Sequence, residues 1–355
     1  MTLLHRSAAG LGPRGARLAA AAAAVGLAAL VLGVALGRAA PALAALTASW
    51  LFFAGLAAGS VALSAAVHLA HGEWARPVLP VAEAGEAFFG PALVLLVVVI
   101  AGLRVLLPGD AAIGWAALRL LVASALVFAL GARFVGRARA PGADPGRVRS
   151  AALAYVLAYV VGLSVWAFDL VLALSEGPVF TVVPPYYFLG AFLSGLAWVS
   201  LVAALRDLSG PDLRHDLGKL LFAFIVVWSY LLWALFLPTW YGDVPEEVAV
   251  LLRRWSGGYR PVTAAVLVAV FVWPFWLLFS ERLKRRRVTL AAGAATILAG
   301  LWGERVLLVL PSLHLRGGVG SLLVGAGVAL GVAGAFALSF GAGEGALAGG
   351  AAPRR

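Results

Sequence analysis

The sequence predicts an all-α integral membrane protein with about ten transmembrane helices. Of its 355 residues, 63% are hydrophobic and only 12% are charged, whereas soluble domains carry about 25% charged residues. The hydrophobic residues lie in long runs, many of roughly twenty residues, which is the length that an α-helix needs to cross ~30 Å of hydrocarbon. Only helices and closed barrels satisfy the backbone polar groups in lipid, and continuous runs of this length fit helices.

Ten apolar runs follow one another along the chain, with Pro and Gly mostly at their ends. We place the helices at residues 17–37, 43–70, 88–108, 112–134, 150–175, 185–206, 216–238, 260–280, 288–311 and 319–341. Residues 1–16 then form an N-terminal tail, 17–341 a single membrane domain, and the Gly- and Ala-rich residues 342–355 a disordered tail. The first run also resembles a signal peptide, but it is long for one, so we expect a retained helix.

The basic residues predict the orientation of these helices. The net charge is +11, and most basic residues lie in alternate loops, with the strongest clusters at 133–149 and 282–287. Because Lys and Arg accumulate in cytoplasmic loops, both tails are predicted to be cytoplasmic, which agrees with an even number of helices. The positive charge therefore reports orientation in the membrane, and we expect no nucleic-acid partner.

Polar residues near the outer ends of the helices form a first group of candidate site residues. They are Asp169, Tyr186, Tyr187, Tyr241, Glu246, Glu304, Arg305 and His314. Charged groups at membrane depth cost at least ~2.5–3.5 kcal/mol on insertion scales, so each needs a partner or a function. One hypothesis is a quinol pocket, where a carboxylate or His takes a proton and donors hold the ring oxygens. The alternative is that the charges neutralise neighbouring helices, the tyrosines form an interfacial belt and the loop acids are solvated.

A second group of polar residues lies near the inner ends. It comprises His68, Glu83, Glu86, His215, Asp216 and Lys219. One hypothesis is the mouth of a proton path, and the alternative is interfacial solvation and capping, since acids favour a helix start. A third hypothesis makes the two histidines axial ligands of a b-type haem. The chain has no cysteine, so it contains no thiolate-bound iron–sulfur cluster and no C-x-x-C-H haem attachment, and no metal motif is present.

Four segments resemble a known family. HDLGKLLFAFIVVWSYLLWALFLPTWYGDVPEE at 215–247 closely resembles the F subunit of bacterial alternative complex III, a quinol:cytochrome c oxidoreductase, in the wider NrfD/polysulfide-reductase superfamily of membrane subunits. Segments 50–84, 167–197 and 303–314 resemble its second helix, its Asp- and Tyr-containing block and its ninth helix. The chain departs from the family at Glu304-Arg305, where an Asp and aromatic residues are common, and in the block after Asp169.

The resemblance implies a fold, partners and cofactors. The fold would be two four-helix bundles, about 43–175 and 185–311, flanked by the first and last helices. The partners would be a sister NrfD-like membrane subunit, a large iron–sulfur subunit and c-type cytochrome subunits, together with lipids. Haem c and the iron–sulfur clusters would belong to those partners, with no cofactor bound by this chain, while quinol or menaquinol would be the substrate of the complex.

We therefore expect a multi-pass subunit of a quinol-oxidising respiratory complex in the bacterial cytoplasmic membrane. The chain would act as a scaffold and a proton-translocation path, and electrons would pass to the iron–sulfur and haem c partners. One alternative is the quinone-binding anchor of a molybdenum or polysulfide-type oxidoreductase. Another is a secondary transporter, although such proteins place broken helices and charges near the midplane, and here these features lie toward the faces.

Overall fold

The computed structural model describes residues 12–107, 113–175, 180–208, 210–313 and 318–350, and these residues are almost entirely helical. The long helices are α2 (Pro13–Ala35), α3 (Ala39–Leu69), α5 (Phe89–Leu106), α6 (Ile113–Ala138), α7 (Pro145–Ala167), α8 (Val183–Leu205), α9 (Pro211–Gly242), α14 (Arg287–Val309) and α15 (Val319–Gly350). The shorter ones are α4 (Leu79–Glu83), α10 (Pro245–Arg254), α11 (Tyr259–Leu267), α12 (Trp273–Phe279) and α13 (Glu281–Lys284). Within the described residues, ten helical segments are long and apolar enough to span a membrane, which confirms the predicted fold class.

Short 3₁₀ and π segments join or extend these helices. The 3₁₀ turns are η1 (Glu73–Ala75), η2 (Ala84–Phe88) and η5 (Leu310–Leu313), and the π turns are η3 (Phe168–Leu172) and η4 (Val268–Val272). The segment η4 lies directly before Pro274, whose missing N–H and bulky ring disturb the preceding helical turn. The segment η3 extends α7 and carries Asp169, and π turns of this kind are common at functional sites.

The helices differ from the sequence prediction at several boundaries. The third span begins earlier than residue 88, because α4 and η2 lead directly into α5. Residues 245–254, predicted as a loop, form α10. The prediction of a disordered tail from residue 342 is wrong as far as Gly350, since α15 continues to that residue. There Glu344 is buried and binds Arg206 through both carboxylate oxygens, which anchors the last turns. Residues 1–11 and 351–355 lie outside the described residues.

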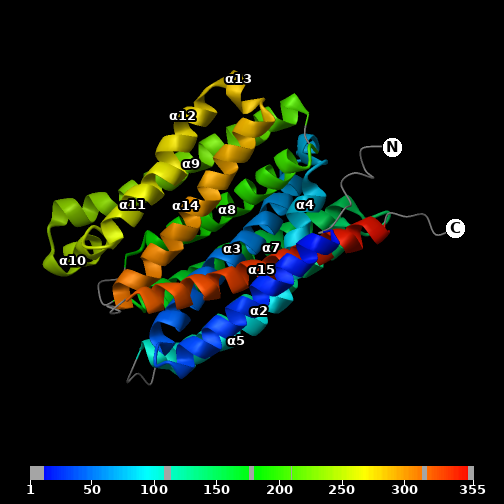
Figure 1. The fold of residues 1–355 in the computed structure, drawn as a ribbon. Helices are drawn as coiled ribbons and strands as arrows, with labels where there is room; N and C mark the ends of the chain where they lie inside the picture. The colour runs from blue at the N-terminus through cyan, green and yellow to red at the C-terminus, as the bar shows by residue number, and fades with distance from the viewer. Residues whose placement is uncertain (1–11, 108–112, 176–179, 209, 314–317, 351–355) are drawn as a thin grey trace.

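The helix α3 lies at the centre of the molecule. It packs against α5, α6 and α7 on one side and against α8 and α14 on the other, and it is almost entirely buried. The second group consists of α8, α9, the α11–α12 span and α14. Helices α2 and α15 lie side by side along their length and cover the outside of α3 (Figure 1). A helix that is apolar on all faces is expected in such a central position.

Two glycines permit the close approach of α3 and α8. A Cβ atom at Gly195 would overlap the backbone of Gly59 and Ser60, and one at Gly59 would overlap the backbone of Ala191. Small residues allow this kind of contact between membrane helices, where dispersion and backbone proximity stabilise packing. The crossing of α3 and α8 therefore joins the two helix groups.

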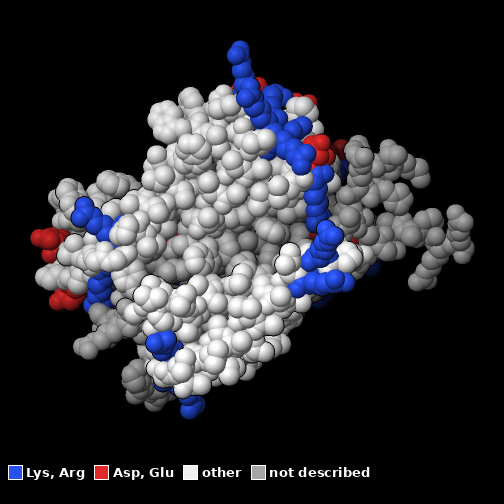
Figure 2. All heavy atoms as spheres, viewed as in Figure 1, with Lys and Arg blue, Asp and Glu red and all other residues white. Residues whose placement is uncertain are grey.

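The two ends of the molecule differ in charge. The start of α2, the end of α15, α4 and α13 lie at one end, and α10 lies at the other (Figure 1). Figure 2 shows Lys and Arg gathered along the first end, a wide band without charges, and both acidic and basic side chains at the α10 end. We call the α10 end the outer end, after the orientation predicted from the loop charges.

We predict that Gly195→Ala destabilises the protein by about 1–3 kcal/mol or more, because the added methyl overpacks a backbone contact. Gly136→Ala is the matched control, since nothing lies within 4 Å of a Cβ at that helical position; it should be neutral or stabilising by up to ~1 kcal/mol. Thermal unfolding of both variants in mild detergent measures the difference. Equal melting temperatures would contradict the proposed backbone contact.

Candidate functional site

A buried ion pair lies within the membrane span of α14. The Glu304 and Arg305 side chains are adjacent in sequence, and Arg305 Nη1 is 2.6 Å from Glu304 Oε2. Glu304 is 3% exposed and Arg305 is 1% exposed. The other carboxylate oxygen, Glu304 Oε1, is buried and has no hydrogen-bond partner among the described residues. The pair therefore neutralises its charge internally, and the Tyr186 side chain lies close to the same carboxylate.

The guanidinium of Arg305 is held by α8. Its Nη2 donates a 3.3 Å hydrogen bond to the backbone oxygen of Tyr187, and the guanidinium carbon lies 4.4 Å from the centre of the Tyr187 ring. Gly190, one turn further along α8, leaves space for the Arg305 side chain. The Tyr187 hydroxyl donates to the backbone oxygen of Leu51 in α3, 2.9 Å away. Cation–π contact and these hydrogen bonds fix the orientation of the cation, and with it the carboxylate.

A cavity of about 320 Å³ ends at Glu304, at the lower end of the ~300–1,000 Å³ typical of small-molecule sites. Its walls are contributed by α8, α9, α10, α11 and α14 in the outer half of the second helix group. They consist of the aromatic residues Tyr186, Trp228, Trp233, Phe236 and Trp255 and of Leu232, Leu235, Leu251, Val266, Leu267, Leu307 and Leu308; Ser229, Arg254, Thr263 and Glu304 supply polar groups. A flat, largely apolar ring with a few polar substituents fits such walls.

Arg254 anchors the outer side of the cavity. Its Nε donates to the backbone oxygen of Leu307, 3.1 Å away, and its Nη1 donates to that of Val250, 2.6 Å away. It thereby ties the end of α10 to the end of α14, where helix carbonyls lack intrahelical partners. Thr263 donates to the backbone oxygen of Arg254 at 2.6 Å and fixes α11 to the same corner.

Asp169 does not line this cavity. Its two carboxylate oxygens accept hydrogen bonds from Arg119 of α6, at 2.5 Å from Nη2 and 3.2 Å from Nε. Asp169 is 3% exposed, whereas the Arg119 side chain is 44% exposed and lies near the Trp115 ring. Both oxygens of Asp169 are therefore engaged by one bidentate partner, the stronger form of a charge-assisted hydrogen bond. The structure separates Asp169 from Glu304, although the sequence predicts one outer site.

The other predicted outer residues have different positions. Tyr241 is 85% exposed and Glu246 is exposed at the start of α10, so neither lines the cavity. Tyr187 lies beneath Arg305 and supports it from α8. His314 lies outside the described residues. Of the predicted outer residues, Tyr186 and Glu304 line the cavity, and Tyr187 and Arg305 support it.

At the inner end, three of the predicted residues come together. Glu83 Oε1 accepts a 3.0 Å hydrogen bond from Ser64 Oγ, and Glu83 Oε2 accepts one of 3.0 Å from Arg139 Nε. Arg139 also lies 3.5 Å from Glu86. His68 lies one turn after Ser64 on α3, with Nδ1 2.9 Å from the Ser64 backbone oxygen. The cluster joins α3, the α4–η2 segment and α6, as the hypothesis of an inner polar site requires.

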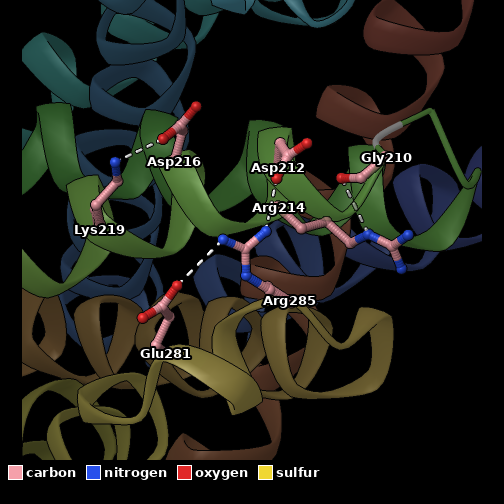
Figure 3. Close-up of polar contacts among 7 residues, drawn as sticks. All are labelled: Gly210, Asp212, Arg214, Asp216, Lys219, Glu281 and Arg285. Atoms are coloured by element: carbon pink, nitrogen blue, oxygen red, sulfur yellow. Dashed lines mark hydrogen bonds and ion pairs between the residues drawn. The ribbon is translucent and has the colours of Figure 1, made fainter.

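The remaining inner residues form a separate cluster where α9 begins (Figure 3). Asp216 pairs with Lys219 at 2.7 Å on α9, and Arg285 after α13 pairs with Asp212 at 2.6 Å and with Glu281 at 3.1 Å. The hydrogen bond from Arg285 holds the pKa of Glu281 below its ordinary value. His215 lies near Glu281, and its Nδ1 is buried without a hydrogen-bond partner among the described residues. The Arg285–Asp212 pair ties α9 to the α12–α14 connection.

The haem hypothesis gains no support from these positions. His68 packs edge-on against Phe134 in the first helix group, with ring centroids 5.5 Å apart, whereas His215 lies on α9 in the second group. Within the described residues, no cluster of three or more His, Cys, Asp or Glu side chains could hold a metal ion. The b-type haem remains a hypothesis based on residue type alone.

Several of the site residues were not predicted from the sequence, among them Trp228, Trp233, Arg119 and Arg254. Trp228 and Trp233 lie inside an apolar run, where they were counted only as part of a span. Arg119 was assigned to a span without a partner, and Arg254 was assigned to a loop. Two features of the sequence could have indicated this part of the cavity. Tryptophans lie in the outer half of the α9 segment, and a ten-residue amphipathic segment with a basic end follows them.

Comparison with known proteins adds no identification. No model of a known protein family matches the chain, and no curated protein matches it. The chemistry of the site must therefore be argued from its own residues.

We predict that the Arg119–Asp169 pair is structural and energetically coupled. Arg119→Gln or Asp169→Asn alone should each destabilise the protein by about 1–3 kcal/mol, less than a fully buried pair because Arg119 is partly exposed. The double variant should lose clearly less than the sum of the two, with a coupling of about 1 kcal/mol. Unfolding in detergent measures each value. Glu73→Gln, in the exposed Arg76–Glu73 pair, is the control and should change stability by at most ~0.5 kcal/mol. Strictly additive losses would contradict the coupling.

Proposed function

We propose that the protein is a membrane subunit of a quinol-oxidising respiratory complex of the alternative complex III type, in the bacterial cytoplasmic membrane. The observation that carries the proposal is the aromatic-walled cavity lined by Glu304, a buried carboxylate with one oxygen, Oε1, that is not hydrogen-bonded among the described residues. Aromatic and aliphatic walls suit a quinol ring, and a carboxylate beside it suits a group that loses protons. The resemblance of segments 50–84, 167–197, 215–247 and 303–314 to the F subunit supports the same assignment.

In the proposed reaction, a quinol enters the cavity and is oxidised to the quinone, with release of two protons and two electrons. Glu304 Oε1 takes one hydroxyl proton, while Arg305 on Oε2 orients the carboxylate. The electrons leave to an iron–sulfur cluster and haem c of partner subunits, because a chain without cysteine cannot hold a thiolate-bound cluster itself. The cluster of Glu83, Glu86 and Arg139 is the proposed inner mouth of a proton path.

Purification through a tag on this chain in mild detergent tests the assembly. We expect iron–sulfur and c-type cytochrome subunits to co-purify with a sister membrane subunit, and quinol to reduce the haem. A co-purifying molybdopterin subunit in place of cytochromes would favour the alternative anchor function. A chain that purifies alone in several detergents and shows no quinol-dependent haem reduction would contradict the proposal and favour a transporter.

We predict that Glu304→Gln in the purified complex lowers quinol oxidation by about 100-fold or more, because it removes the proton acceptor and keeps the shape. Glu247→Gln is the matched control: this residue is half-buried in the first turn of α10 and does not line the cavity, and turnover should stay within about twofold. Steady-state reduction of haem c by menadiol gives the rates, and the haem spectrum checks that each complex is intact. Equal rates for both variants would refute the role of Glu304.

A further inference from the structure

A buried tryptophan in the cavity wall carries an unpaired hydrogen-bond donor. Trp228 of α9 is 2% exposed, lines the cavity and packs against Tyr186, with ring centroids 5.8 Å apart. Its Nε1 is buried and has no hydrogen-bond partner among the described residues. Two comparably buried tryptophans do have partners: Trp50 Nε1 donates to the Ala92 backbone oxygen at 2.7 Å, and Trp166 Nε1 donates to Ser124 Oγ at 2.9 Å. Trp228 therefore differs from these two tryptophans, because its indole N–H has no partner among the described residues.

The unpaired atoms of these two wall residues, Trp228 and Glu304, are complementary in kind. An indole N–H can only donate, and a carboxylate oxygen can only accept. Both Trp228 Nε1 and Glu304 Oε1 belong to side chains that are more than nine-tenths buried and line the same cavity. In surroundings this apolar, an unpaired donor or acceptor is unfavourable. A ligand with one donor and one acceptor would satisfy both, whereas a lipid acyl chain would satisfy neither.

We propose that Trp228 is a second binding residue of the quinol ring, opposite in role to Glu304. One ring hydroxyl donates to Glu304 Oε1, and the other ring oxygen accepts from Trp228 Nε1. This assignment rests on the proposed function and refines it, because it requires a ring with two oxygens. The carbonyl of the quinone product remains an acceptor, so Trp228 holds substrate and product alike. Its loss should therefore weaken binding and leave the chemical step largely unchanged.

The test uses Trp228→Phe in the purified complex, which keeps an aromatic wall and removes the N–H. We expect the KM for menadiol to rise about tenfold and kcat to stay within about twofold. The inhibition constant of 1-naphthol, a ring with a single hydroxyl, should remain unchanged, because that hydroxyl is held by Glu304. Trp198→Phe is the control: its Nε1 is also buried without a partner among the described residues, but it packs on Phe336 and Phe340 away from the cavity. It should leave both constants unchanged.

Two results would overturn the inference. An unchanged KM in Trp228→Phe would show that the N–H makes no contact with the ring. A parallel rise of the KM and of the 1-naphthol constant would show that the substitution only disturbs the cavity wall. A wild-type protein without quinol oxidation refutes the proposed function instead. Equilibrium dialysis of radiolabelled menadione against wild type and Trp228→Phe then decides the binding inference, which requires weaker binding to the variant.

Discussion

The ion pair of Glu304 and Arg305 is the constraint around which the second helix group is arranged. A charge at membrane depth costs at least ~2.5–3.5 kcal/mol on insertion scales unless it is compensated. Here the pair is compensated internally, and Arg305 is held further by the backbone and ring of Tyr187. This arrangement requires α8 and α14 to lie close together, and Tyr187 in turn bonds to α3. The position of the free carboxylate oxygen therefore depends on contacts between both helix groups.

The two buried acids of the outer half have different surroundings and are suited to different roles. Asp169 has both oxygens bound by a bidentate arginine. Glu304 has one oxygen bound and one free, and the free oxygen belongs to a residue that lines an aromatic cavity. The difference arises from the positions of the arginines. Arg119 lies on a different helix from Asp169, whereas Arg305 directly follows Glu304 in the sequence. The acceptance of the quinol proton is accordingly proposed for the second helix group alone.

The fold could be predicted from sequence largely because the hydrocarbon core fixes the length of each apolar run. The same reasoning gave the depth of Tyr186 and Glu304 along their spans. It could not separate Asp169 from them, because helices that are apolar on all faces carry no periodic signal of which side faces which neighbour. Trp228 was not predicted as a site residue for the same reason, because only the packing of the helices shows that it lines a cavity. The short helix α10 was not predicted because ten residues are too few for a membrane span. The helical structure of residues 342–350 was not predicted because these residues are rich in Gly and Ala.

The central claim is that the quinol ring binds between α8, α9, α11 and α14. Photoaffinity labelling with an azido-quinone in the purified complex tests this claim most directly. Mass spectrometry of the labelled peptides should place the adducts on the outer half of α9, on α11 and beside Glu304, and an excess of unlabelled menadione should prevent them. Adducts confined to the first helix group around Asp169, or to a partner subunit, would contradict the account.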